Sequence, residues 1–168
     1  MAMQTIEELF EHELKDMYSG EKALLDALEQ MAAESEDKEI RKGFTQHRKE
    51  TQAQIKRLEK IFKSMGQKPQ AETCHGIEGL IKEKKAFMKE RPSPELVEFF
   101  NVGAAQKVER YEITSYENLI DMADKLGMTD AVELLEQSLQ EEEATLNRLK
   151  MIASEYDVME EEEEAAVE

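Results

Sequence analysis

The sequence predicts an all-α fold, a four-helix bundle of two antiparallel hairpins with a short extra helix in the crossover between the second and third long helices. Three observations support this fold. The 168 residues include only 7 Gly and 3 Pro, while good helix formers such as Leu, Glu, Lys and Ala dominate. Apolar residues recur every three or four positions through four long segments. The connections within each pair of segments are short, which favours antiparallel neighbours.

The first hairpin is expected to join two helices of similar length. The first helix should run from about Thr5 to about Glu34, because Thr5 and Glu8 have the spacing of a capping box. The second should run from about Lys38 to Met65 and end at Gly66, a residue type that favours the position after a helix.

The second half of the chain begins with a crossover, residues 67–94, which carries a short amphipathic helix and ends in an Arg-Pro-Ser-Pro stop. The third long helix is expected over about 94–126 and the fourth over about 129–156. Residues 1–158 then form a single domain. Residues 159–168 are an acidic run without a core pattern, and we expect them to be a disordered tail.

The charge of the chain argues against several partners. The formal net charge is −17, and even without the eight acids that follow from Glu155 onward the body stays acidic. A nucleic-acid backbone or an anionic membrane surface is therefore not expected as a partner. One Cys, no signal-peptide pattern and no apolar run of membrane-spanning length together predict a soluble cytoplasmic protein.

Each predicted long helix has a polar interruption of its apolar face near mid-length. In an antiparallel bundle these positions meet in one layer. Five carboxylates in that layer cannot all stay ionised without compensation, and a pair of metal cations is the simplest compensation. Carboxylate and imidazole ligands suit iron or manganese. The candidate metal ligands are Glu21, His47, Glu50, Glu109, Glu112 and Glu142.

Other interpretations of these residues stay open. A single Glu on an apolar face is often a boundary residue that reaches solvent, and a lone His is often a hydrogen-bonded core residue. The whole layer is also compatible with a protonated or Arg-paired network that holds no metal. Lys107 and Arg110 lie near its flank.

Several segments carry a family resemblance. In chain order they are TIEELFEHELKDMYSGEKALLDAL, FTQHRKETQAQIKRLE, CHGIEGLI, AAQKVERYEITSYENL and LLEQSLQEEEATLNRL. Together they resemble the YciF-like bacterial stress proteins, a ferritin-like family whose activity is not established. The resemblance implies a rubrerythrin-like four-helix bundle, a homodimer and a di-metal centre. Carried over by position, it implies the ligand set Glu21, His47, Glu50, Glu109, Glu112 and Glu142.

The sequence also departs from the usual ferritin-like pattern. Di-iron proteins of this kind usually show Glu-x-x-His on two helices, whereas here one helix has His47-x-x-Glu50 and another has Glu142-x-x-Thr145. Arg110 stands where the YciF-like pattern often has His. A site with one inner His is harder and more anionic, and Arg110 is a candidate counter-charge for it.

Three functions follow as hypotheses. The first is a rubrerythrin- or manganese-catalase-like oxidoreductase that acts on peroxide or dioxygen. The second is a metal-binding or storage protein without turnover. The third is a non-enzymatic structural or interaction protein with a relic metal site. The sequence favours a ferritin-like stress protein with a dinuclear site, and leaves open whether the protein is an enzyme.

Overall fold

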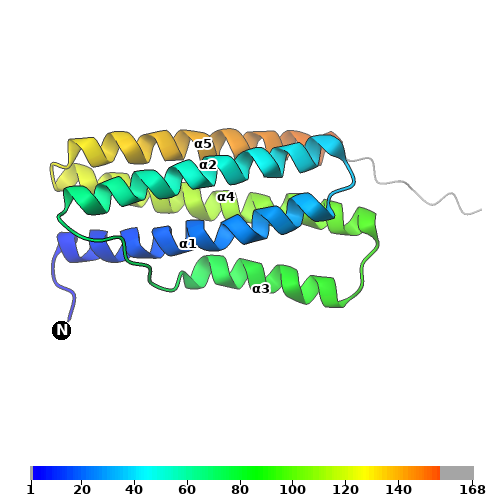
Figure 1. The fold of residues 1–168 in the computed structure, drawn as a ribbon, viewed down its shortest axis with the longest axis horizontal. Helices are drawn as coiled ribbons and strands as arrows, with labels where there is room; N and C mark the ends of the chain where they lie inside the picture. The colour runs from blue at the N-terminus through cyan, green and yellow to red at the C-terminus, as the bar shows by residue number, and fades with distance from the viewer. Residues whose placement is uncertain (1, 156–168) are drawn as a thin grey trace, which may run out of the picture.

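The computed structural model of the protein describes residues 2–155, in which all regular structure is helical and no strand occurs. Four long helices lie side by side, and a shorter one lies along two of them (Figure 1). The prediction of an all-α fold is therefore confirmed. The elements are α1 (Ile6–Glu34), α2 (Lys38–Ser64), α3 (His75–Lys89), α4 (Pro94–Lys125) and α5 (Thr129–Glu155).

The helix ends match the predicted signals closely. Thr5 caps α1, since its side chain accepts a hydrogen bond from the amide of Glu8 at 3.2 Å and the Glu8 carboxylate accepts one from the Thr5 amide at 3.1 Å. Asp37 caps α2 by accepting bonds from two amides of its first turn. After α2, Gly66 adopts a left-handed φ of 71°, as expected for a residue that ends a helix.

The second half of the molecule also follows the predicted order. The short helix expected in the crossover is α3, and Ser93 caps α4 with Pro94 at its first position. The turn before α5 passes through Gly127, which has a φ of 69°. The predicted acidic tail, residues 159–168, lies outside the described residues, and the predicted end of the last helix near residue 156 does too.

The long helices enclose two apolar clusters with a polar layer between them. One cluster contains Phe10, Leu14, Leu58, Phe62, Leu119 and Leu135; the other contains Leu24, Leu28, Phe44, Val102, Ala105 and Leu149. Along α1, α2 and α5 the buried polar residues lie between the members of the first cluster and those of the second, and on α4 Glu109 and Glu112 do, while Glu98 and Asn101 are buried nearer the start of that helix. The layer that the sequence predicted at mid-length is therefore present.

None of the helices within residues 2–155 has both the length and the apolar character needed to cross a membrane.

The start of α3 packs tightly against α1 and α4. A Cβ atom at Gly76 would lie 2.3 Å from the ring of Tyr111, and one at Gly20 would lie 3.1 Å from Ile77. The Tyr111 hydroxyl also donates a hydrogen bond to Asp16 at 3.2 Å and lies 3.4 Å from the sulfur of Cys74. Glycine at these positions lets α3 approach the long helices closely.

This packing gives a matched pair of variants on one helix. Gly76→Ala should lower the free energy of unfolding by about 1–3 kcal/mol, because its methyl group overlaps the Tyr111 ring. Gly79→Ala meets no atom within 4 Å and should raise the free energy of unfolding by about 0.5–1 kcal/mol through helix propensity. Urea denaturation followed by circular dichroism measures both, and equal effects would contradict the close contact.

Candidate metal centre

Four buried side chains from three helices meet inside the polar layer. One ligand atom from each lies within 4.8 Å of the others. Glu109 and Glu112 are three residues apart on α4, which places them on one face of the helix. We call the group the central cluster; it consists of His47 on α2, Glu109 and Glu112 on α4, and Glu142 on α5.

The imidazole of His47 lies among carboxylates. Its Nε2 atom is 3.0 Å from Oε1 of Glu109 and 3.8 Å from Oε2 of Glu142. These contacts lack hydrogen-bond geometry. Both ring nitrogens, both oxygens of Glu109 and of Glu112, and Oε2 of Glu142 have no hydrogen-bond partner among the residues that the structure describes. Buried polar atoms are rarely left this way, since each unmet hydrogen bond costs about 1–3 kcal/mol.

The electrostatics of the layer favour neutralisation. Burial, together with the neighbouring carboxylates, raises the pKa of Glu112 and of Glu142 well above the usual range. Burial alone would lower the pKa of His47, but the adjacent Glu109 carboxylate outweighs it and raises that pKa well above its usual value. Without a metal, Glu112 and Glu142 therefore hold protons more tightly than ordinary carboxylates do.

Glu21 on α1 belongs to the same layer but lies outside the central cluster. It is fully buried, and one of its oxygens accepts a hydrogen bond from the hydroxyl of Tyr116. Its other oxygen has no hydrogen-bond partner within the described part of the chain. Burial raises the pKa of Glu21 to about 8. The sequence predicted Glu21 as a ligand, and the structure leaves it one free oxygen for that role.

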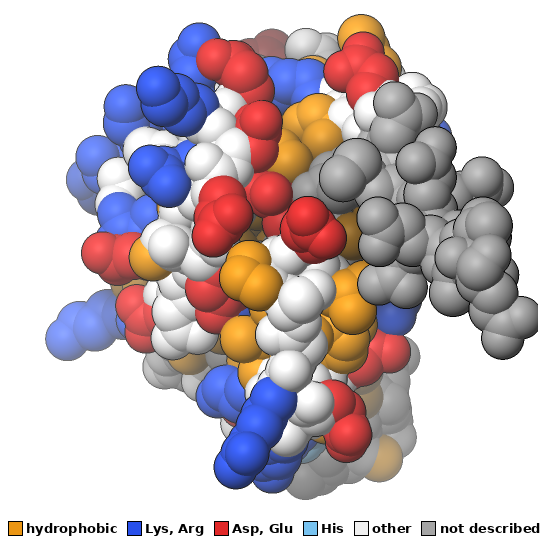
Figure 2. All heavy atoms as spheres, turned by 90° about the vertical axis from the view of Figure 1, so that its right-hand side faces the viewer, with side chains coloured by type: hydrophobic (Ala, Val, Ile, Leu, Met, Phe, Trp, Pro, Cys, Tyr) orange, Lys and Arg blue, Asp and Glu red, His pale blue; other side chains and the backbone are white. Residues whose placement is uncertain are grey.

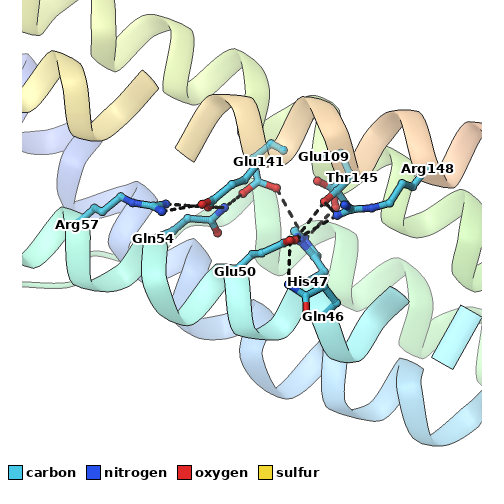
Figure 3. Close-up of polar contacts among 10 residues, drawn as sticks. Gln46, His47, Glu50, Gln54, Arg57, Glu109, Glu141, Thr145 and Arg148 are labelled. Carbon is cyan, nitrogen blue, oxygen red and sulfur yellow. Dashed lines mark hydrogen bonds and ion pairs between the residues drawn. The ribbon is translucent and has the colours of Figure 1, made fainter. Parts of the chain in front are cut away.

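Glu50 lies at the outer edge of the layer, beside the central cluster rather than within it (Figure 3). Its carboxylate accepts hydrogen bonds from Gln46 at 3.1 Å and from Arg148 at 3.2 Å, and lies 3.7 Å from Nδ1 of His47. Burial alone would raise the pKa of Glu50, but these neighbours outweigh it and lower the pKa to about 2. Glu50 is therefore ionised and paired with Arg148.

The sequence did not indicate Gln54 as a site residue, yet it is fully buried two turns after His47 on the same face of α2. Its side-chain amide donates hydrogen bonds to Glu142 and, at 3.0 Å, to Glu141. Arg57 in turn binds both oxygens of Glu141, at 2.6 and 2.7 Å (Figure 3). This chain of contacts orients Glu142. The only signal in the sequence was the seven-residue spacing from His47.

The expectation that Arg110 serves as a counter-charge is wrong. Arg110 is exposed and donates hydrogen bonds to the carbonyl and side chain of Gln106. It directly follows Glu109, and adjacent residues on a helix point about 100° apart, so it turns away from the layer. Lys107 likewise pairs with Glu83 at 2.7 Å on the surface. Neither cation neutralises the central cluster.

A comparison with family models matches residues 5–162 to one described as a domain of unknown function, DUF892. The chain belongs to this family. A curated relative is Protein YciF from Escherichia coli (strain K12), which is 38% identical over 154 residues, 91% of this chain and 93% of the relative. The resemblance to YciF-like proteins that the sequence suggested is therefore confirmed.

Solved structures agree with this placement of the DUF892 protein. The crystal structure of the Escherichia coli stress protein YciF matches with a TM-score of 0.85 and 37% identity, over 90% of this chain and 96% of that one. YcfI from Rhodopseudomonas palustris matches with a TM-score of 0.85 and 39% identity, over 88% and 94%. A Xanthomonas campestris protein with 22% identity and a TM-score of 0.72, over 90% and 92%, shows the fold alone.

The raised pKa of Glu21 predicts an unusual pH dependence of the metal-free DUF892 protein. Between the ordinary carboxyl value of 4.5 and the folded value of about 8, the folded state binds more protons than the unfolded state. The contribution of Glu21 to stability therefore falls as pH rises through this window. Glu21→Gln keeps an oxygen for Tyr116 but cannot ionise, so it should lose less stability than the natural chain.

Chemical denaturation at pH 5 and pH 8, in the presence of chelator, measures this difference. The control is Glu117→Gln on the exposed side of α4, which should lose as much stability between the two pH values as the natural chain does. If Glu21→Gln and the natural chain lose equal stability between the two pH values, the raised pKa of Glu21 is contradicted.

Proposed function

We propose that this DUF892 protein is a ferritin-like four-helix-bundle stress protein that holds a carboxylate-rich dinuclear centre of iron or manganese. The observation that carries the proposal is the set of buried carboxylate oxygens and imidazole nitrogens without hydrogen-bond partners in the central cluster. The description of the relative YciF as a stress protein supports the physiological part. The resemblance to YciF-like proteins suggests a homodimer, and the single Cys suits a reducing compartment such as the cytoplasm.

The donor set favours hard divalent cations. Three carboxylates and one imidazole in the central cluster suit iron or manganese better than a thiolate-preferring metal. The four residues group closely enough to serve one ion. A second ion would draw on the free oxygen of Glu21 and on Glu50, which would exchange Arg148 for the metal. Metal binding would release the protons that the acids hold, so affinity should rise with pH.

Iron or manganese at this centre would supply redox chemistry toward peroxide or dioxygen. The chain's own residues would hold the ions and limit access of water, because the central cluster is buried between two apolar clusters. An oxidoreductase of the rubrerythrin or manganese-catalase kind is the enzymatic form of this proposal. Metal storage without turnover is the non-enzymatic form.

A second candidate is a structural or interaction protein with a proton-neutralised layer. YcfI, a relative of known structure, is described only as a candidate structural protein. Two hydrogen bonds in the layer, from Tyr116 to Glu21 and from Gln54 to Glu142, already give one oxygen of each of these carboxyl groups a partner without metal. Metal content distinguishes this candidate from the first.

Ligand variants should have opposite effects on metal uptake and on metal-free stability. Glu109→Gln and Glu112→Gln each replace a buried acid, which its neighbouring carboxylates repel when it is ionised, with a neutral amide, so at alkaline pH the metal-free variants should melt higher than the natural chain. Each also removes a ligand, so the variants should bind little iron or manganese and lose the stabilisation that metal gives, about 2.7 kcal/mol at a metal concentration 100 times the Kd. Elemental analysis and thermal melting measure the two effects.

The exposed residue Glu117 on the same helix provides the control. Glu117→Gln should take up metal as the natural chain does, after both are purified without chelator or stripped and reloaded. Normal metal uptake by both ligand variants would contradict the proposed dinuclear centre. A natural chain that neither contains nor accepts iron or manganese would favour the structural candidate instead.

Turnover is tested separately on the loaded protein. If the protein is an oxidoreductase, the metal-loaded natural chain should consume hydrogen peroxide and the stripped chain should not. Oxygen release or loss of peroxide absorbance reports the rate. A loaded protein without activity would leave the storage form of the proposal.

A further inference from the structure

A pocket of about 390 Å³ lies between α2 and α5 and extends to the central cluster. Of the four cluster residues, only His47 and Glu109 line it, so the pocket reaches one side of the cluster. Its walls are mostly apolar. The apolar residues lining it are Ile40, Phe44, Ala105, Leu149, Met151 and Ile152.

The size and setting of the pocket suit a small organic molecule. Pockets for such ligands usually have volumes of about 300–1,000 Å³, apolar walls and a few polar groups that orient the ligand. Met151, on the pocket wall, exposes 63% of its surface, although it is a large apolar residue. Figure 2 views the end of the molecule where α2 begins and α5 ends, and shows hydrophobic side chains at its surface among charged ones.

The charges on the wall and at the inner end of the pocket are paired, which argues for an uncharged ligand; the exposed Glu155 at the end of α5 also lines the pocket and has no ion pair among the described residues. Near the mouth, Lys42 lies 3.8 Å from Glu39. On the wall, Arg148 lies 3.2 Å from Glu50, and at the inner end His47 lies 3.0 Å from Glu109.

A charged head group would be unfavourable in this setting. An anionic head group at the inner end would meet the Glu109 carboxylate, and a cationic one would meet the His47 and Arg148 side chains. An uncharged hydroxyl group avoids both. It can donate a hydrogen bond to an oxygen of Glu109, which has no other hydrogen-bond partner among the described residues.

We propose that this pocket binds an uncharged organic molecule with an apolar body and one hydrogen-bonding head, such as a medium-chain alcohol. The head lies at the inner end beside Glu109 and His47, and the body lies along Phe44, Leu149 and Ile152. The pocket's role as a substrate site rests on the proposed function, because the organic molecule would lie beside the same metal centre. Binding itself does not require the metal, and so it can be tested alone.

Gly43 offers a way to fill the pocket without disturbing the core. It lies on α2 in the pocket lining, and a Cβ atom there meets no atom within 4 Å. Gly43→Phe should therefore fold normally, gain helix propensity and occupy part of the pocket. Gly103 on α4 has the same open surroundings outside the pocket lining, so Gly103→Phe is the matched control.

The probe is N-phenyl-1-naphthylamine, a neutral apolar dye that fluoresces on binding, added to the full-length, chelator-treated protein. Gly43→Phe should weaken binding of the dye at least about tenfold, and Gly103→Phe should leave it unchanged. Ile152→Gln, which places a polar group in the wall from α5, should weaken binding in the same direction and supports the assignment if Gly43→Phe does not fold. No binding to the natural chain, or equal binding by all variants, would overturn the proposal.

Three eight-carbon competitors then test the head group. 1-Octanol should displace the dye at a concentration at least about tenfold lower than octanoate or octylammonium, which share its body but carry a charge. Equal displacement by all three, or preference for a charged one, would overturn the uncharged class. Dye binding that falls as protein concentration rises would assign the pocket to a second copy of the chain and overturn the small-molecule site.

The metal content of Gly43→Phe distinguishes this proposal from the proposed function. A variant that loads metal like the natural chain but loses the dye supports a ligand pocket distinct from the metal ligands. If the natural chain binds the dye but takes up no metal, the metal centre and the pocket's role as a substrate site are contradicted, whereas the ligand pocket itself is supported.

Discussion

The burial of several like-charged groups between two apolar clusters is the constraint on which the rest of this structure depends. Glu21, Glu109, Glu112 and Glu142 are each almost completely removed from solvent. At such a depth, ionised carboxylates a few ångströms apart repel strongly, because little water screens them. The layer is therefore stable only when something positive occupies it, whether protons, the His47 imidazolium or metal cations. The raised pKa values are one expression of this requirement.

The same layer restricts how the long helices can align. If α2 slid by one turn along α5, Leu58 would take the place of Gln54 opposite Glu142 in one direction, and Phe44 would take the place of His47 in the other. The Gln54 amide would then lose its buried acceptor. Each loss costs free energy, since buried polar groups need partners. Our hypothesis for this fold is that the buried polar residues, although they weaken the core, disfavour alternative registers of the long helices.

Much of this arrangement could be predicted, because it depends on spacing along single helices. Periodicity located the four long helices and placed Glu109 and Glu112 on one inward face. Pairings between helices could not be predicted in the same way. Gln54 and Glu142 lie 88 positions apart, and nothing local to either residue indicates the other. Glu50 was predicted as a ligand within the layer and lies at its edge, and its pairing with Arg148 depends on how two distant helix faces meet.

The hydrogen bonds around the central cluster differ from one side to the other, and this difference constrains what the centre can do. On the side of Glu142, the contacts of Gln54, Glu141 and Arg57 form a continuous network that fixes one carboxylate in place. On the side of His47 and Glu109, the cluster faces the pocket between α2 and α5.

If the central cluster holds a metal as proposed, a ligand or an ion would exchange more easily from the pocket side, where fewer hydrogen bonds must break. Arg148, which lines the pocket, is tied to the layer through Glu50 and Thr145. The Arg148 side chain is half exposed, so it can leave Glu50 and enter solvent without becoming a buried, unpaired charge. The Arg148–Glu50 pair is thus the contact whose opening would free a further carboxylate for the centre.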